Sequence, residues 1–334
     1  MRKELHLFQV IFILLMVSPI LFLLPQPAGA TVAEVYLPLV LRTWGGVPSL
    51  TVKNSCSFAI WVQQSKEHRL IDTPLIQKIE ASQSFDYAVD PKGIISTRFW
   101  PKWGCNAQGE KCTWGQSREG LGGPDDYPPC PAGGCHPAVD SLMEITWGCT
   151  FPDPTNNPLC ENKAAVTSYD GSLVDGYSLP FKITRSGDSA DSCQDIDCSG
   201  LTLASCPTNE DLSHGNRDKT TIYPEFSAVD LNGSNLGTKT ACFSPCGYMT
   251  SATSYGGKQF TSSDDRAILY CCPTPKDSPI FILSPECNAG PVPNTQYVNL
   301  IHQKCPKTYA FAYDDLQGLY NCHFKTKFTL TYCP

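Results

Sequence analysis

The sequence predicts an all-β protein in which a disulfide-rich loop subdomain is inserted into a β-sandwich core. Three observations support this prediction. Short stretches of alternating or β-branched residues recur along the chain, and Gly, Pro, Asn and Asp turn residues separate them. No long helical period competes with these stretches. The 334 residues include 18 cysteines, an even number that suits a framework of disulfides.

Eight stretches have the pattern of β-strands. They are residues 50–54, 59–63, 84–89, 94–100, 141–147, 165–169, 181–184 and 325–332. The last one is the clearest, because Phe328, Leu330 and Tyr332 alternate with polar residues and so predict a strand with one buried face. We expect this C-terminal strand to close the sandwich.

The loop subdomain is predicted at residues 193–305, where cysteine density rises and strand signals thin out. Residues 205–246 have a polar, loop-like composition with room for a short helix at most. A segment of this kind buries too little apolar surface to fold alone, so we expect it to depend on its cross-links.

The first thirty residues resemble a secretory signal peptide. Arg2 and Lys3 precede an apolar run over residues 5–25, and small residues at 28–30 offer a cleavage site. A retained membrane anchor is the alternative, since the run is close to spanning length, but Pro19 and the cleavage site favour removal. We therefore expect a secreted protein with a connector at residues 31–48 and one domain at 49–334, and in that setting the cysteines form disulfides.

The composition excludes several classes of function. With 25 Lys and Arg against 32 Asp and Glu, the net charge is -7, so there is no basic surplus for nucleic acid or an anionic membrane. Paired Cys-x-x-Cys zinc knuckles are absent from the sequence. We therefore predict no metal and no other cofactor, and no nucleic-acid partner.

The distribution of the cysteines constrains their pairing. Seven lie between Cys56 and Cys160, and eleven between Cys193 and Cys333. Two odd groups cannot each pair internally, so at least one disulfide must join them if all are oxidised. The adjacent Cys271 and Cys272 are expected to have different partners. Beyond this the spacing leaves the connectivity open.

Five segments, in order, resemble the thaumatin-like proteins. Residues 54–62 resemble the family's opening strand pair, and 99–105 its Trp-x-Arg-x-x-Cys strand. Residues 169–180 are similar to its Tyr-Asp-x-Ser-Leu-Val-Asp-Gly-aromatic-x-x-Pro run, while 305–315 and 331–334 are similar to its C-terminal pattern. The resemblance covers about residues 50–334 and implies the thaumatin-like sandwich, as a monomer.

The family's disulfide pattern, carried over by position, uses sixteen of the cysteines. The implied pairs are Cys56–Cys333, Cys105–Cys112, Cys130–Cys135, Cys193–Cys322, Cys198–Cys305, Cys206–Cys242, Cys246–Cys271 and Cys272–Cys287. The two remaining cysteines, Cys149 and Cys160, would close a local insertion as a ninth pair. The sequence departs from the family pattern between residues 115 and 130.

The resemblance also implies a binding site. Thaumatin-like proteins that act on fungi have an acidic cleft between the sandwich and the loop subdomain, built from one Arg, one Glu and three Asp. By motif these positions fall on Lys102, Glu144, Asp170, Asp175 and Asp314. Lysine keeps the positive charge of the arginine but lacks the planar fork that binds a carboxylate through two parallel hydrogen bonds.

Such a cleft implies binding of β-1,3-glucan, and weak endo-β-1,3-glucanase and antifungal activity as further implications. Hydrolysis needs one protonated carboxyl as acid and a second, ionised carboxylate. Glu144 stands on an apolar strand, where desolvation raises a carboxyl pKa. We expect Glu144 to be the acid and Asp175 or Asp170 its charged partner. Three tyrosines offer flat faces for sugar rings: Tyr177, Tyr309 and Tyr313.

Each of these residues also has a purely structural interpretation. Glycine follows both Asp170 and Asp175, and such dipeptides form turns in which the aspartate caps its own loop. Asp314 belongs to an Asp-Asp pair that can form a solvated corner. Glu144 can be the ion-pair partner of Lys102.

Two other functions stay open at this point. The protein can be an inhibitor or protein-recognition module with a vestigial cleft, and the insertion at 149–160 would then contact a protein target. It can also be a structural secreted protein without a specific partner. A sequon at residues 232–234 would permit N-glycosylation in a host with the machinery.

Overall fold

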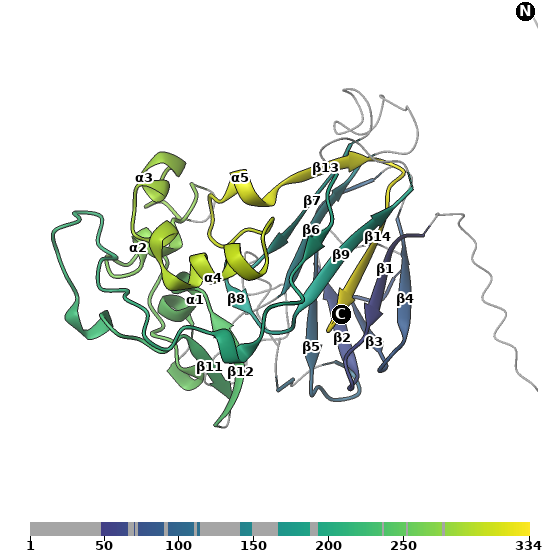
Figure 1. Cartoon of the computed structure of the whole chain (residues 1–334), viewed down its shortest axis with the longest axis horizontal. Helices are drawn as coiled ribbons and strands as arrows, with labels where there is room; N and C mark the ends of the chain where they lie inside the picture. Colours follow the sequence, from purple (N-terminus) through teal and green to yellow (C-terminus); the bar gives the residue numbers. More distant parts are fainter. Residues whose placement is uncertain are drawn as a thin grey trace, which may run out of the picture. The chain divides into compact units, whose positions relative to one another are not determined.

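Two β-sheets carry most of the strands (Figure 1). The computed structural model describes residues 48–65, 70, 73–89, 93–109, 112–113, 141–148, 166–187, 193–235, 237–251, 253–275 and 278–334. The signal peptide and nearly all of the connector lie outside these residues and stay predictions. None of the helices formed by the described residues has the length and apolar character needed to cross a bilayer.

The first sheet has five strands in the order β10-β9-β14-β1-β4. The strands are β1 (Pro48–Asn54), β4 (Ser84–Ala88), β9 (Phe181–Ser186), β10 (Ile196–Asp197) and β14 (Lys327–Tyr332). β1 and β14 are parallel, with Leu50 opposite Phe328 and Val52 opposite Leu330. All four side chains are buried. The C-terminal strand was expected to close the sandwich, and it does so by pairing with the first strand.

The second sheet has six strands in the order β13-β7-β6-β5-β2-β3, and each pair of neighbouring strands is antiparallel. The strands are β2 (Ile60–Gln64), β3 (Ile76–Ile79), β5 (Ile94–Trp103), β6 (Leu142–Trp147), β7 (Val166–Ser172) and β13 (Tyr320–His323). Met143, Ile145 and Trp147 are buried, whereas the residues between them are half-buried. This alternation gives the sheet one face for the core and a second, more polar face.

Aromatic side chains join the two sheets across the core. The ring centroids of Tyr87 on β4 and Phe99 on β5 are 5.1 Å apart. Tyr169 on β7 and Phe328 on β14 make a similar contact at 4.8 Å. Such tilted and edge-to-face pairs add to the free energy gained by burying the rings.

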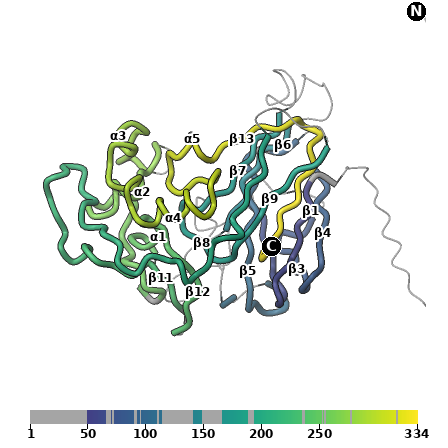
Figure 2. The backbone as a smooth tube through the Cα atoms, in the orientation of Figure 1, coloured from purple at the N-terminus to yellow at the C-terminus, as the bar shows by residue number. Residues whose placement is uncertain are grey.

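The chain from about residue 193 to 305 forms a lobe beside the sheets (Figure 2, teal to yellow-green). It contains a hairpin of β11 (Asn232–Asn235) and β12 (Thr238–Phe243), which pairs with β8 (Gly176–Tyr177). Its helical segments are short: η1 (Leu203–Ser205), η2 (Pro224–Phe226), α1 (Pro245–Thr250), η3 (Thr253–Tyr255), α2 (Ile268–Cys271), α3 (Ser284–Asn288), η4 (Val292–Asn294) and α4 (Gln296–Lys304). Helix α5 (Asp315–Gly318) then leads back to β13.

Seven disulfides form among the described residues, and they are pairs that the family resemblance implies. They are Cys56–Cys333, Cys105–Cys112, Cys193–Cys322, Cys198–Cys305, Cys206–Cys242, Cys246–Cys271 and Cys272–Cys287. Cys193–Cys322 fastens the lobe to β13, and four of the others lie within the lobe. The pairs Cys130–Cys135 and Cys149–Cys160, like the insertion at 149–160, lie outside the described residues.

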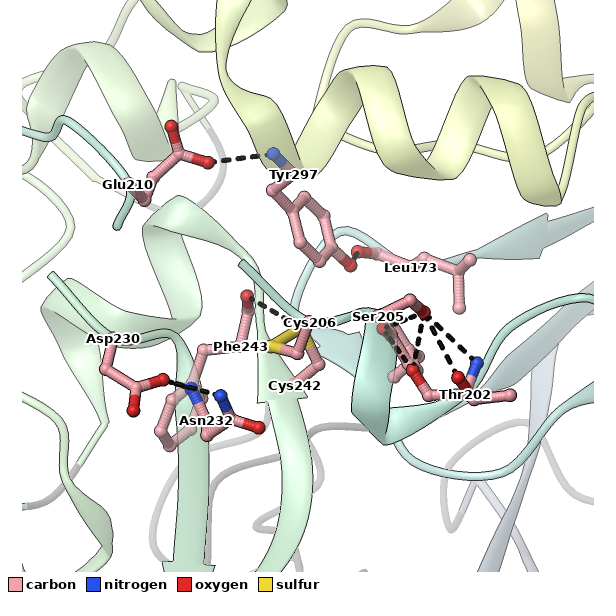
Figure 3. The surroundings of a disulfide bond; sticks show 11 residues. Leu173, Thr202, Ser205, Cys206, Glu210, Asp230, Asn232, Cys242, Phe243 and Tyr297 are labelled. Carbon is pink, nitrogen blue, oxygen red and sulfur yellow. Dashed lines mark hydrogen bonds between the residues drawn. A yellow bond between two sulfur atoms is a disulfide. The ribbon is translucent and has the colours of Figure 1, made fainter. Parts of the chain in front are cut away.

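A buried phenol connects the lobe to the loop after β7, and a buried carboxylate caps the helix that carries it (Figure 3). Glu210 accepts the backbone N–H groups of Gln296 and Tyr297 at 3.0 and 2.8 Å, and so caps the start of α4. The hydroxyl of Tyr297 donates to the carbonyl of Leu173 at 2.6 Å. These bonds fix α4 against the chain segment that leads from β7 to β8.

All eight strands predicted from the sequence are present, with small shifts at their ends. The hairpin of β11 and β12 was not predicted, because Asn, Gly and Ser dominate β11 and resemble a loop. Its Asn232 belongs to the sequon and is half-buried, and its Nδ2 donates to Asp230 Oδ1 at 2.5 Å. The nine residues of α4 were too few to show a helical period.

Candidate functional site

One arginine and two carboxylates form a row across three neighbouring strands. Arg98 on β5 lies opposite Glu144 on β6, and Glu144 lies opposite Asp170 on β7. Residues directly opposite each other in antiparallel strands share a face, with Cβ atoms about 4.5–5.5 Å apart. The guanidinium of Arg98 forms an ion pair with Glu144, and about 30% of the arginine side chain and 28% of the glutamate side chain are exposed.

Asp170 is the buried member of this row. Only 7% of its surface is exposed. Burial, together with the charge of Glu144, raises its pKa well above the ordinary value, and the charge of Arg98 opposes this shift. The neighbouring Gly171 is needed for the close packing, because a Cβ there would lie 2.9 Å from the side chain of Thr308.

Asp175 joins the row from the loop between β7 and β8. Its backbone carbonyl accepts the N–H of Ser244 at 3.2 Å, and a Cβ on Gly247 of α1 would lie 2.2 Å from the same oxygen. Desolvation by the surrounding protein is the main cause that raises the pKa of Asp175 to about 6. The positive charge of Arg98 opposes this shift, and the negative charge of Glu144 adds to it. The side chain is nevertheless exposed, so solvent reaches the carboxylate and screens part of this effect. We call Glu144, Asp170 and Asp175 the carboxylate cluster.

The family resemblance implied that Lys102 and Tyr177 line the cleft, but both side chains are buried inside the protein. Lys102 is fully buried on β5, and its Nζ donates to Gln63 Oε1 at 3.0 Å. The ion pair with Glu144 is made by Arg98 instead. Tyr177 is fully buried, with its hydroxyl 2.9 Å from the carbonyl of Thr202. Its ring is therefore closed to a sugar.

The two neighbouring aspartates, Asp314 and Asp315, have different environments. Asp314 is buried, and its Oδ2 accepts the N–H of Ala310 at 3.0 Å and lies 2.7 Å from His302 Nε2. Asp315 instead accepts the hydroxyl of Tyr309 on Oδ1 at 2.7 Å. Asp314 thus holds its own loop, and Asp315 is the aspartate of the pair that bonds to Tyr309.

Tyr309 lies between Asp315 and the carboxylate cluster. Burial raises the pKa of its phenol most, the bond to Asp315 raises it further, and the charges of Asp315, Asp170 and Glu144 act in the same direction. The third tyrosine named from the sequence, Tyr313, donates to the carbonyl of Ile282 at 2.9 Å. Both tyrosines are half-buried, and the phenol of Tyr309 is close enough to Asp170 and Glu144 for their charges to act on it.

The sequence motifs did not single out Arg98 and Asp315. Glu144 stands in the polar phase of β6, which alternates, but β5 gave no such signal for Arg98, because the consecutive Phe99 and Trp100 are both buried. The register of β5 and β6, which is interrupted between Ile94 and Thr97, could not be read from the sequence. For Asp315, only the conformation of the loop distinguishes it from Asp314.

The carboxylate cluster can bind polyhydroxylated ligands. Ionised carboxylates accept charge-assisted hydrogen bonds from hydroxyl groups, and a carboxyl with a raised pKa can also donate one. A proton donor and an ionised partner side by side are the groups that glycoside hydrolysis uses. Within the described ranges, no three His, Cys, Asp or Glu side chains gather where they could hold a metal ion.

A family model and several known proteins match the chain. The model of the thaumatin family matches residues 54–334. A glucan endo-1,3-beta-glucosidase of Prunus avium is 26% identical over 89% of this chain and 96% of that protein. Thaumatin-like protein 2 of Prunus persica is 25% identical, over 90% of this chain and 98% of its own length. The solved structure of a thaumatin-like xylanase inhibitor covers 85% of this chain and 99% of its own, at 10% identity and a TM-score of 0.30.

Proposed function

The chain belongs to the thaumatin family, and on this premise we propose that it is a secreted protein that binds β-1,3-glucan at the carboxylate cluster. The seven disulfides among the described residues support export, since such frameworks persist in oxidising compartments. The glucan is suggested by the similar protein that is named a glucan endo-1,3-beta-glucosidase.

The observation that carries this proposal is the row of Arg98, Glu144 and Asp170, extended by Asp175. Arg98 and Asp170, the two ends of the row, are 72 residues apart in the sequence. The register of the strands brings them onto one face of the sheet. Arg98 holds Glu144 in place by an ion pair, so its carboxylate is fixed before a ligand arrives. Asp175 is exposed and can accept or donate hydrogen bonds to sugar hydroxyls.

Hydrolysis of the bound glucan is a second candidate function. Asp175 is accessible, and the surrounding protein raises the pKa of its carboxyl above the ordinary value, so at acidic pH it carries a proton more often than an ordinary aspartate and can pass it to the glycosidic oxygen. The bond from the anomeric carbon to that oxygen breaks, and the leaving sugar keeps the electron pair. Glu144, ionised beside Arg98, attacks the anomeric carbon or takes a proton from the attacking water. In this proposal the acid is Asp175, and Glu144 is the charged partner.

Retention on an insoluble β-1,3-glucan tests the binding. We expect the secreted protein to be retained on curdlan and not on cellulose. Glu144→Gln and Asp175→Asn should each weaken retention about tenfold, because each loses a charged hydrogen-bond acceptor. Asp86→Asn is a matched control, since Asp86 is an exposed carboxylate on β4 that contacts Thr51.

Each outcome decides one part of the proposal. A wild-type protein that curdlan does not retain contradicts glucan binding. If curdlan retains Glu144→Gln and Asp175→Asn as strongly as the control Asp86→Asn, the glucan binds somewhere else on the molecule. Reducing-sugar release by the wild type that survives in Asp175→Asn would overturn the assignment of the acid, while binding would stand.

A further inference from the structure

A second row of polar side chains crosses the same face of the six-stranded sheet as the carboxylate cluster. Thr146 on β6 lies opposite Ser168 on β7, and Ser168 lies opposite Asn321 on β13. The three strands are neighbours in the sheet (Figure 1), and residues directly opposite each other share a face. We call Thr146, Ser168 and Asn321 the polar row.

The polar row continues the carboxylate cluster along the strands. Thr146 follows Glu144 by two residues on β6, and Ser168 precedes Asp170 by two residues on β7. Side chains two residues apart in a strand point to the same face and are about 7 Å apart. A sugar chain that lies along β6 and β7 at the cluster therefore passes over the polar row.

This continuation lies on the side of the cluster away from the lobe. The segment that follows α4 meets β7 at its C-terminal end, where the N–H of Tyr309 donates to the carbonyl of Gly171 at 2.9 Å. Ser168 stands nearer the start of the strand. The polar row thus extends the site along the sheet, beyond the part that this segment borders.

The polar row offers hydrogen-bonding groups without charge. Ser168 Oγ donates to Asn321 Oδ1 at 2.6 Å, so the lone pairs of the serine oxygen are left to accept. Thr146 Oγ1 accepts the N–H of Ser96 at 2.9 Å, and its own proton is available for donation. The three side chains of the row are half-buried, which holds them in place and leaves part of each open to a ligand.

Two exposed apolar side chains flank the polar row. Val166 precedes Ser168 by two residues on β7 and is 46% exposed, and Leu319 precedes Asn321 by two residues and is 52% exposed. Ligand sites combine apolar surface with a few placed polar groups. A pyranose matches this composition, because its C–H groups need apolar contacts and its hydroxyls need hydrogen-bond partners.

We propose that the polar row, with Val166 and Leu319, is a second saccharide subsite through which the protein selects a long, uncharged glucan chain over short oligosaccharides. This proposal rests on the proposed function. The chain leaves the carboxylate cluster along β6 and β7. One of its hydroxyls accepts the proton of Thr146, and another donates to Ser168 Oγ. Because the row is neutral, it adds affinity for an unsubstituted polysaccharide and none for an ionic one.

Calorimetric titration with the series from laminaribiose to laminarihexaose tests the subsite. The wild-type affinity should rise with chain length up to laminarihexaose. The double variant Thr146→Val/Ser168→Ala keeps the shape of the row and loses one donor and one acceptor. We expect it to bind laminarihexaose about tenfold more weakly than the wild type, and to bind the shortest oligosaccharide of measurable affinity equally well. Thr184→Val/Ser186→Ala is the matched control, because these residues face away from the core on β9 of the other sheet.

The dependence on chain length separates a subsite from a general effect on the fold. A loss of the same size for every oligosaccharide would overturn the subsite, and so would a double variant that binds laminarihexaose as tightly as the control. If thermal unfolding shows that the double variant does not fold, Thr146→Val alone takes its place, with an expected loss of about threefold for laminarihexaose. A wild-type protein that binds none of the oligosaccharides would instead overturn the proposed function.

Discussion

Asp175 should make the protein less stable at neutral pH than at acidic pH. The pKa of its carboxyl in the folded protein is about 6, raised from 3.8. Below pH 3.8 the group is protonated in both states, whereas above pH 6 the folded protein has to hold a charge that its surroundings disfavour. Stability from this group is therefore fully present below the unfolded pKa and is lost as pH rises through about 6.

The size of this effect follows from the shift. Roughly two pKa units correspond to about 3 kcal/mol. The side chain is exposed, and solvent screens the interactions of exposed groups. We therefore expect about 1 kcal/mol. Asp175→Asn removes the charge and keeps the shape, so the variant should be more stable than the wild type at pH 7 by about 1 kcal/mol, equivalent to about 2–4 °C in melting temperature.

Thermal unfolding of both proteins at pH 4, 5, 6 and 7, with the disulfides intact, measures this difference. The stabilisation by Asp175→Asn should grow as the pH rises through the interval between 4 and 6. An identical difference at pH 4 and pH 7 would refute the reasoning. So would a variant that is less stable than the wild type at pH 7. Together with weaker glucan retention, the expected result would identify Asp175 as a residue kept for binding at the expense of stability.

Three further predictions concern the scaffold that holds the cluster. Replacing Cys56 and Cys333 by Ala removes the disulfide between the first and last strands. This should lower the free energy of unfolding by about 2–5 kcal/mol. An unchanged melting temperature would contradict this prediction. Gly247→Ala should destabilise the protein by about 1–3 kcal/mol and weaken curdlan retention, because its Cβ would lie 2.2 Å from the Asp175 carbonyl. Gly200→Ala is its control, since the nearest atom there is 3.4 Å away. His302→Ala removes one hydrogen-bond partner of the buried Asp314. It should lower the free energy of unfolding by about 1–3 kcal/mol and reduce the affinity for laminarihexaose. Unfolding in urea and calorimetry check both effects, and wild-type values for His302→Ala would count against the loop as a support of the carboxylate cluster.

The sandwich could be predicted because its signals are local. In β14, Phe328, Leu330 and Tyr332 alternate with polar residues, and this alternation needs no knowledge of the partner strand. The hairpin of β11 and β12 has no such signal, since the strand propensity of β11 is low and the hairpin is supported instead by the pairing of β12 with β8. The seven disulfides came from the family resemblance, because spacing alone allowed many pairings.

The candidate site could be predicted only in part, for the same physical reason. Motifs located Glu144 and Asp170, and the register of β6 and β7 then places them side by side. Whether Arg98 or Lys102 reaches Glu144 depends on the register of β5, which is set by a bulge. Tyr177 is buried because Tyr297, more than a hundred residues later, stacks on it at 6.4 Å. Such contacts between distant segments leave no local trace in the sequence.

A crystal structure of the protein with laminarihexaose would test the central claim most directly. The account predicts a glucan chain whose hydroxyls bond to Glu144 and Asp175, and which continues over Thr146 and Ser168. A hexasaccharide bound on another face of the molecule, with Arg98 still paired to Glu144 and the cluster open to solvent, would contradict it.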